Sequence, residues 1–241
     1  MFRNSNIIQL LIVFLIANIL ISGHLPRLLS LLLSDPILAL STIAGIIIGI
    51  TVHEFSHAFV AYRLGDPTAK LQGRLTLNPA SHLDPVGTLM IIFLGIGFGK
   101  PTPFDPYNLR NIKRDSALIS VAGAVSNFIL AILLSVPYLL AYYTHSLNPT
   151  IIQLYYYLSA LIFINVGLGV FNLLPVSPLD GFKVVAGLLP RDWYEDFMQM
   201  ERYGIFILML LLIFPGLLSS IVFPPIAKII ELLLPGFSTP I

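Results

Sequence analysis

The sequence predicts an all-α polytopic membrane protein with about six transmembrane helices and a re-entrant segment near residues 84–98. Hydrophobic residues make up 56% of the 241-residue chain and charged residues only 10%, whereas a soluble domain carries about a quarter charged residues. Several apolar runs approach or exceed the ~20 residues with which a helix crosses a bilayer. We expect a single transmembrane domain over 1–241, with a core at 36–190 and peripheral helices at 7–23 and 203–234.

The apolar runs define the expected elements in chain order. The first run lacks the cleavage site of a signal peptide, so we expect a helix that is kept. In the third run, Gly87, Gly95 and Gly97 favour a hairpin or broken helix over a straight span. Such backbone survives at membrane depth only where protein buries it or water reaches it. The runs lie at about 7–23, 36–62, 84–98, 115–143, 152–174 and 203–223, with a shorter one at 225–234.

The basic residues predict how the chain is threaded. If 84–98 returns to the side it came from, every Lys and Arg except Arg27 and Lys228 lies on one side of the membrane. Loops rich in Lys and Arg stay in the cytoplasm, so we place the N-terminus there, in a multi-pass protein of the cell membrane. The net charge of +1 does not suggest nucleic acid as a partner, and the lack of cysteine excludes disulfides and thiolate sites.

Residues 53–57, HEFSH, place ionisable side chains inside an apolar run. On a helix, His53 and His57 lie at i and i+4 on one face, where both imidazoles can reach one Zn²⁺. Glu54 can then take a proton from a zinc-activated water that attacks a carbonyl. The alternative is a pair of interior histidines bonded to neighbours, with Glu54 neutral. An ionisable cluster inside a membrane favours the metal site.

A hydrolytic zinc needs a third protein ligand, and Asp180 is the best candidate. Glu54 lies nine residues before Arg63, about 14 Å along a helix, and Asp180 lies eleven residues before Arg191, about 16 Å. The two acidic residues thus lie at similar depth. The alternative for Asp180 is a turn residue in a proline-rich loop. His24, His82 and His145 lie outside the apolar spans.

The motifs HEFSH and NLLPVSPLDG resemble those of the site-2 protease family of intramembrane zinc metalloproteases. NPASHLDPVGT, GKPTPFDPYNLR and GAVSN resemble further family segments. The resemblance implies a metalloprotease domain in a minimal form without a PDZ or CBS domain. It implies one Zn²⁺ per chain held by His53, His57 and Asp180, with Glu54 as the catalytic base. It also implies that the substrates are transmembrane proteins, cleaved within the bilayer in regulated intramembrane proteolysis.

The remaining candidate residues have less specific signals. Asn172, at a helix end, could hold a substrate carbonyl oxygen or bond its own backbone. We expect Gly123 and Asn127 to serve helix packing, with Asn127 bonding across the interface. His82 is expected to be exposed or to brace a loop. We expect Tyr155, Tyr156 and Tyr157 to form an interfacial belt, and Trp193 and Tyr194 to lie at the opposite interface.

Three functions compete for these residues. An intramembrane zinc endopeptidase uses all of them. A zinc transporter would be expected to show internal repeats or a second polar cluster along its route, and the sequence shows neither. A catalytically inactive scaffold is not favoured, because Glu54 and all three expected ligands are present. The sequence does not indicate the oligomeric state.

Overall fold

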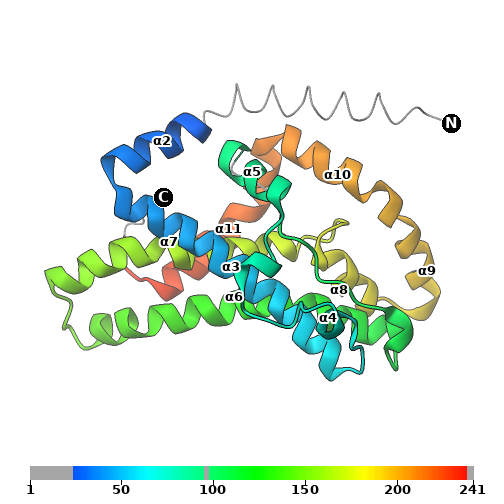
Figure 1. The fold of residues 1–241 in the computed structure, drawn as a ribbon. Helices are drawn as coiled ribbons and strands as arrows, with labels where there is room; N and C mark the ends of the chain where they lie inside the picture. Colours follow the sequence, from blue (N-terminus) through cyan, green and yellow to red (C-terminus); the bar gives the residue numbers. More distant parts are fainter. Residues whose placement is uncertain (1–23, 95–97, 238–241) are drawn as a thin grey trace.

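The computed structural model describes residues 24–94 and 98–237, which form helices joined by loops (Figure 1). Within these ranges there is no strand, only an isolated antiparallel bridge between Leu83 and Gly99. The expected helix at 7–23 lies outside the described residues. The elements are α2 (His24–Ser34), α3 (Pro36–Arg63), α4 (Thr68–Leu71), η1 (Pro79–Ser81), α5 (Pro85–Leu94), η2 (Pro106–Asn108), α6 (Ile112–Tyr143), α7 (Pro149–Asn172), α8 (Asp180–Leu188), α9 (Arg191–Gln199), α10 (Glu201–Ile213) and α11 (Pro215–Leu233).

Length and composition make four helices of the described chain candidate membrane spans, which supports an all-α polytopic membrane protein. They are Pro36–Arg63, Ile112–Tyr143, Pro149–Asn172 and Gly216–Leu233. One expected element differs. The run at 203–223 is not a single helix, because α10 ends at Ile213 and α11 begins at Pro215. Proline is favoured in the first turn of a helix, so a new helix, α11, begins at Pro215. Helix α11 also includes most of the segment at 225–234, which was predicted as a separate element.

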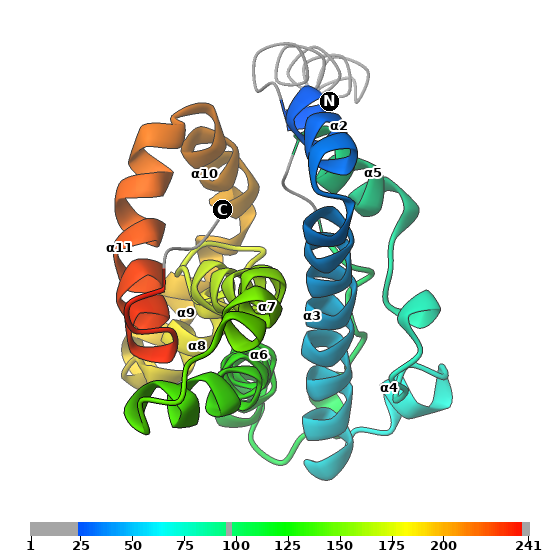
Figure 2. The same ribbon diagram turned by 90° about the vertical axis from the view of Figure 1, so that its left-hand side faces the viewer.

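Helix α3 lies across the pair formed by α6 and α7 and packs against both. Figure 2 shows α3 on one side of this pair and α11 on the other. Helix α8 packs against α6, which brings the start of α8 to the face of α6 that α3 covers. The four elements α3, α6, α7 and α8 therefore surround the middle of the molecule.

The main apolar core lies between α6, α7 and α11 and includes Ala131, Ile162, Val166 and Ile226. Tyr155 belongs to this core. It is 2% exposed, and its hydroxyl donates to the carbonyl oxygen of Leu134 at 2.9 Å. The expectation that Tyr155 is a belt residue is therefore wrong: a buried tyrosine with a satisfied hydroxyl is a core residue.

The helices around the site start at sequence-coded caps. Asp35, Asn111 and Asn148 each accept a hydrogen bond from the first turn of α3, α6 and α7, respectively. These side chains satisfy backbone N–H groups that have no helical partner. Helix α7 ends at Asn172, and α8 begins at Asp180. Pro175 and Pro178 lie in the break between them, as the sequence predicted.

The described ends of the segment 84–98 lie side by side. Leu83 bridges to Gly99, and the N–H of Lys100 donates to the carbonyl oxygen of His82 at 2.7 Å. Helix α5 fills the first part of the segment. The chain therefore leaves and returns at the same place, which is the arrangement expected of a re-entrant segment.

Candidate metal centre

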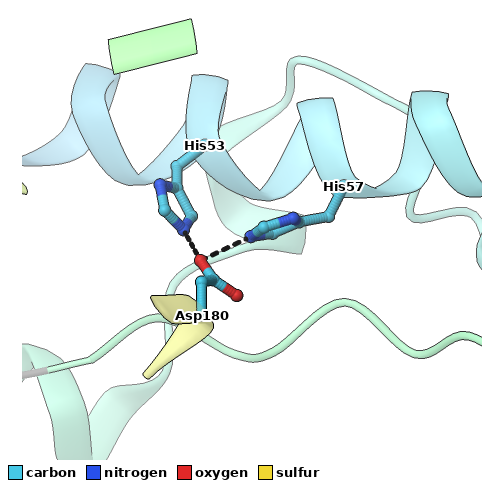
Figure 3. A group of neighbouring side chains, drawn as sticks. All are labelled: His53, His57 and Asp180. Atoms are coloured by element: carbon cyan, nitrogen blue, oxygen red, sulfur yellow. Dashed lines mark hydrogen bonds and ion pairs between the residues drawn. The ribbon is translucent and has the colours of Figure 1, made fainter. Parts of the chain in front are cut away.

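His53 and His57 project from one face of α3, one turn apart, and both rings point toward Asp180 (Figure 3). Both histidines are buried, at 7% and 8% exposed. The i, i+4 spacing places the two side chains one above the other, as the sequence predicted. Their ring centroids are 4.6 Å apart with an edge-on geometry.

Asp180 supplies the third group from the first residue of α8. Its Oδ2 lies 3.0 Å from Nε2 of His53 and 3.2 Å from Nε2 of His57. One ligand atom from each residue lies within 4.8 Å of the other two. Ligand atoms of a tetrahedral zinc lie about 3.3 Å apart, so the spacing fits such an ion. The structure thus brings together the three residues that the sequence singled out as ligands.

The outer nitrogens of both histidines are occupied by oxygen acceptors. Nδ1 of His57 lies 2.7 Å from the carbonyl oxygen of Ile119. A carbonyl only accepts hydrogen bonds, so Nδ1 of His57 carries a proton. Nδ1 of His53 lies 2.8 Å from Oδ1 of Asn127. The Asn127 amide nitrogen donates to the carbonyl oxygen of Gly49, which fixes the orientation of the amide.

These tautomers decide what the cluster can hold. With Nδ1 protonated, a neutral imidazole presents a lone pair at Nε2. The inner face of the cluster then consists of two nitrogen lone pairs and a carboxylate, all of them acceptors. Three such converging groups can hold a cation between them, and two imidazoles with one carboxylate are a ligand set typical of zinc.

Gly123 on α6 provides the space at this point. A Cβ built on Gly123 would lie 2.6 Å from Nε2 of His53 and 2.6 Å from Nε2 of His57, far inside van der Waals contact. Helix α6 can approach the inner nitrogens only because residue 123 has no side chain. The sequence analysis assigned Gly123 to helix packing. The structure shows that it also borders the ligand atoms.

Asn127 lies one turn after Gly123 and is fully buried. It bonds across helix interfaces, as expected, to the carbonyl oxygen of Gly49 at 3.0 Å and to Oδ1 of Asn165 at 2.9 Å. Its bond to His53 is the contact that the sequence reasoning missed. The signal was available, because the four-residue spacing of GAVSN places Gly123 and Asn127 on one face of a helix.

Glu54 follows His53 on α3 and is partly buried. Its Oε2 accepts the N–H of Thr102 at 2.8 Å, and its backbone carbonyl oxygen accepts the Thr102 hydroxyl at 2.9 Å. Glu54 is therefore bonded to the segment that contains Thr102 and is not one of the three clustered groups. Thr102 lies in the motif GKPTPFDPYNLR, but nothing in the sequence had assigned a role to Thr102 itself.

The structure shows the contacts of the remaining candidates. The amide nitrogen of Asn172 donates to the carbonyl oxygen of Leu168 at 3.0 Å, which is the bond to its own helix that formed one of the two alternatives. His82 is fully buried, not exposed. Its Nε2 lies 2.7 Å from the carbonyl oxygen of Thr76, so His82 braces the loop before α5.

Comparisons with known proteins agree with the site. The sequence model of peptidase family M50 matches residues 141–214, which include Asp180. The chain is 38% identical over 175 residues to the putative zinc metalloprotease YwhC of Bacillus subtilis, covering 70% of this chain and 78% of that protein. It is 32% identical over 180 residues to the putative zinc metalloprotease Rip2 of Mycolicibacterium smegmatis, covering 73% of this chain and 67% of that protein.

The Rip2 protein of Mycobacterium tuberculosis is 29% identical over 181 residues, with the same coverage of 73% and 67%. No solved structure gives a significant match. The YwhC relationship exceeds 30% identity over most of both chains. This chain therefore belongs to peptidase family M50, the site-2 protease family of membrane zinc metalloproteases.

Proposed function

We propose that this protein is an intramembrane zinc endopeptidase that hydrolyses peptide bonds within transmembrane segments of other membrane proteins. One observation carries the proposal. His53, Glu54 and His57 lie on α3, a helix that is long and apolar enough to span a membrane, and Asp180 of α8 completes the acceptor cluster with the two histidines. Ionisable groups at such a place are costly and mark functional sites.

In this proposal, the chain's residues divide the work of hydrolysis. Zinc held by His53, His57 and Asp180 would supply Lewis-acid chemistry, lowering the pKa of water and polarising the peptide carbonyl. Glu54 accepts the proton of the water whose oxygen attacks the carbonyl carbon. When the C–N bond breaks, Glu54 returns that proton to the leaving amine nitrogen. The Asn172 amide nitrogen has a second N–H that its helix bond does not use, and this N–H would donate to a substrate carbonyl oxygen.

The depth of Glu54 predicts where the cut falls. Helix α3 ends at Arg63, nine residues or about 14 Å beyond Glu54. With Arg63 at the cytoplasmic surface, the scissile bond lies inside the hydrocarbon near that surface. A stable substrate helix shields its carbonyl groups, so the substrate must unwind locally. An extended substrate could lie against the exposed edge beside the re-entrant segment.

The testing experiment uses purified full-length protein with a reporter whose transmembrane helix carries Gly or Asn near its cytoplasmic end. We expect cleavage inside the hydrocarbon, located by mass spectrometry, and resistance of an otherwise identical reporter with an unbroken Leu run. A zinc chelator should stop cleavage and added zinc should restore it. Zinc-loaded protein that cuts neither reporter but carries zinc into proteoliposomes would support a transporter and contradict the proposal.

A further inference from the structure

Residues 99–105, GKPTPFD, run along α3 beside Glu54, and we call this segment the strap. Thr102 holds Glu54 at two points, through its N–H to Oε2 and through its hydroxyl to the backbone carbonyl oxygen. Pro101 and Pro103 flank Thr102. Proline has no N–H and favours an extended residue before it, so this stretch offers a single backbone donor in a restricted conformation. This single donor, the Thr102 N–H, forms its hydrogen bond with Glu54.

Arg74 braces the first part of the strap. Its side chain is largely buried, at 6% exposed for the residue, and Nη2 donates to the carbonyl oxygen of Lys100. On the same residue of the strap, the N–H of Lys100 donates to the carbonyl oxygen of His82 at 2.7 Å. Arg74 and His82 thus hold the strap at Lys100, two residues before Thr102.

The charge of Arg74 has no close acidic partner. Within the described ranges, no carboxylate lies within ion-pair distance of Arg74. Burial lowers the pKa of the Arg74 guanidinium, and the negative charge of Glu54 opposes this shift. Burying a charge without a partner costs free energy, so a role in bracing the loop alone would not explain why residue 74 is an arginine.

The far end of the strap is anchored beyond the end of α3. The N–H of Asp105 donates to Oδ2 of Asp66 at 2.8 Å, and Asp66 is fully buried. Between the anchors, Phe104 packs against the small core of Ala61, Leu109 and Ile119. The strap therefore follows α3 from Glu54 to just past its last turn, fixed at both ends.

We propose that the strap positions Glu54 for proton transfer, with Thr102 and Arg74 as its positioning residues. The inference rests on the proposed function, because it takes Glu54 to be the base. A glutamate side chain on a helix can rotate, and a base works only within hydrogen-bond reach of its proton. The Thr102 N–H holds Oε2 and thereby restricts rotation of the Glu54 carboxylate. Arg74 keeps the strap, and with it that N–H, in place.

Thr102→Pro removes both the N–H and the hydroxyl and keeps an extended backbone, while Thr102→Val removes only the hydroxyl, so the difference between the two variants reports on the N–H. We expect Thr102→Pro to bind zinc like the wild type and to lose about 100-fold in kcat with KM unchanged, as for a misplaced catalytic group. Thr102→Val should lose much less. Thr144→Val, at the far end of α6, is the matched control and should equal the wild type.

Arg74→Lys keeps a positive donor and Arg74→Met keeps only the bulk. We expect Arg74→Met to lose kcat about 10-fold or more with zinc content and KM unchanged, and Arg74→Lys to recover most of that loss. Arg110→Gln, a change at an exposed cation, is the control and should have no effect. A role in folding alone would lower the yield or the melting temperature and would not separate kcat from KM.

The outcomes separate the inference from the proposed function. A zinc-loaded wild type that cuts no reporter contradicts the proposed function. An active wild type whose Thr102→Pro variant keeps its kcat overturns the strap inference alone, as does loss of zinc from that variant. Should Thr102→Pro fail to fold, the arginine pair decides: unchanged kcat in Arg74→Met overturns the inference, and a kcat loss recovered in Arg74→Lys supports it.

Discussion

Oδ1 of Asn127 lies 2.8 Å from Nδ1 of His53, so a residue of α6 sets the tautomer of a proposed ligand on α3. Such outer contacts orient ligands, and their loss typically costs 10- to 100-fold in metal affinity. We therefore expect Asn127→Ala to weaken zinc binding by about that factor. Competition with a chelating dye measures it. Ser135→Ala, farther along α6 and bonded only to the carbonyl oxygen of Ile132, should leave the affinity unchanged.

Glu54→Gln should retain zinc and lose cleavage, because it removes the base and leaves the three ligands intact. His53→Ala, His57→Ala and Asp180→Ala should each lower zinc content and activity together. Metal analysis beside the reporter assay distinguishes the two classes. Full zinc occupancy in Asp180→Ala would show that the third ligand lies elsewhere, and loss of zinc from Glu54→Gln would count against its role as a base.

Gly123→Ala should abolish zinc binding, because the added methyl group would lie 2.6 Å from Nε2 of both His53 and His57. The matched control is Gly216→Ala on α11, where a Cβ would meet nothing within 4 Å. Zinc content and melting temperature of the two variants give the comparison. A Gly123→Ala protein that folds and retains zinc would show that α6 can move away from the cluster.

The sequence predicted the cluster because each part had a local signal. The H-E-x-x-H spacing fixes two side chains on one helix face, and the prolines before Asp180 mark a break at matching depth. The strap was not predicted, because residues 99–105 have no periodicity and their partners are set by the tertiary path. The break at Phe214 was not predicted, because hydropathy does not change where one helix ends and the next begins inside an apolar run. Pro215 was a signal for a helix start at this point.

Asp66 should make stability depend on pH at the acid end. Its buried carboxylate accepts hydrogen bonds from Thr68, Asn108 and the N–H of Asp105. Burial raises the pKa of this carboxyl, but these bonds outweigh burial and hold the pKa below its usual 3.8. A depressed folded pKa stabilises the fold above the unfolded value of about 3.9, and the gain is lost as pH falls toward the folded pKa.

Asp66→Asn cannot ionise, so it should be less stable than the wild type by about 1–3 kcal/mol at pH 7. The difference should shrink as the pH falls below about 4. Thermal melting in detergent at pH 7 and at lower pH values measures both. Asp192→Asn, at an exposed position of α9, should melt like the wild type at pH 7. A difference for Asp66→Asn that grows on acidification would reverse the assigned sign.

Single cysteines test the threading of the chain, which offers a clean background because it has no native cysteine. Positions 110 and 196 are exposed at one end of the helix bundle and Ser146 at the other end of α6. The distribution of Lys and Arg places the first two in the cytoplasm. In intact cells, a membrane-impermeant thiol reagent should therefore label only Ser146→Cys, and in inverted vesicles only Arg110→Cys and Asp196→Cys.

The bridge between Leu83 and Gly99 requires the chain to return at the face it left. Labelling of Arg110→Cys but not of Ser146→Cys in intact cells would mean that 84–98 crosses the membrane, because α6 places these two positions on opposite sides; the charge asymmetry would then have been misread.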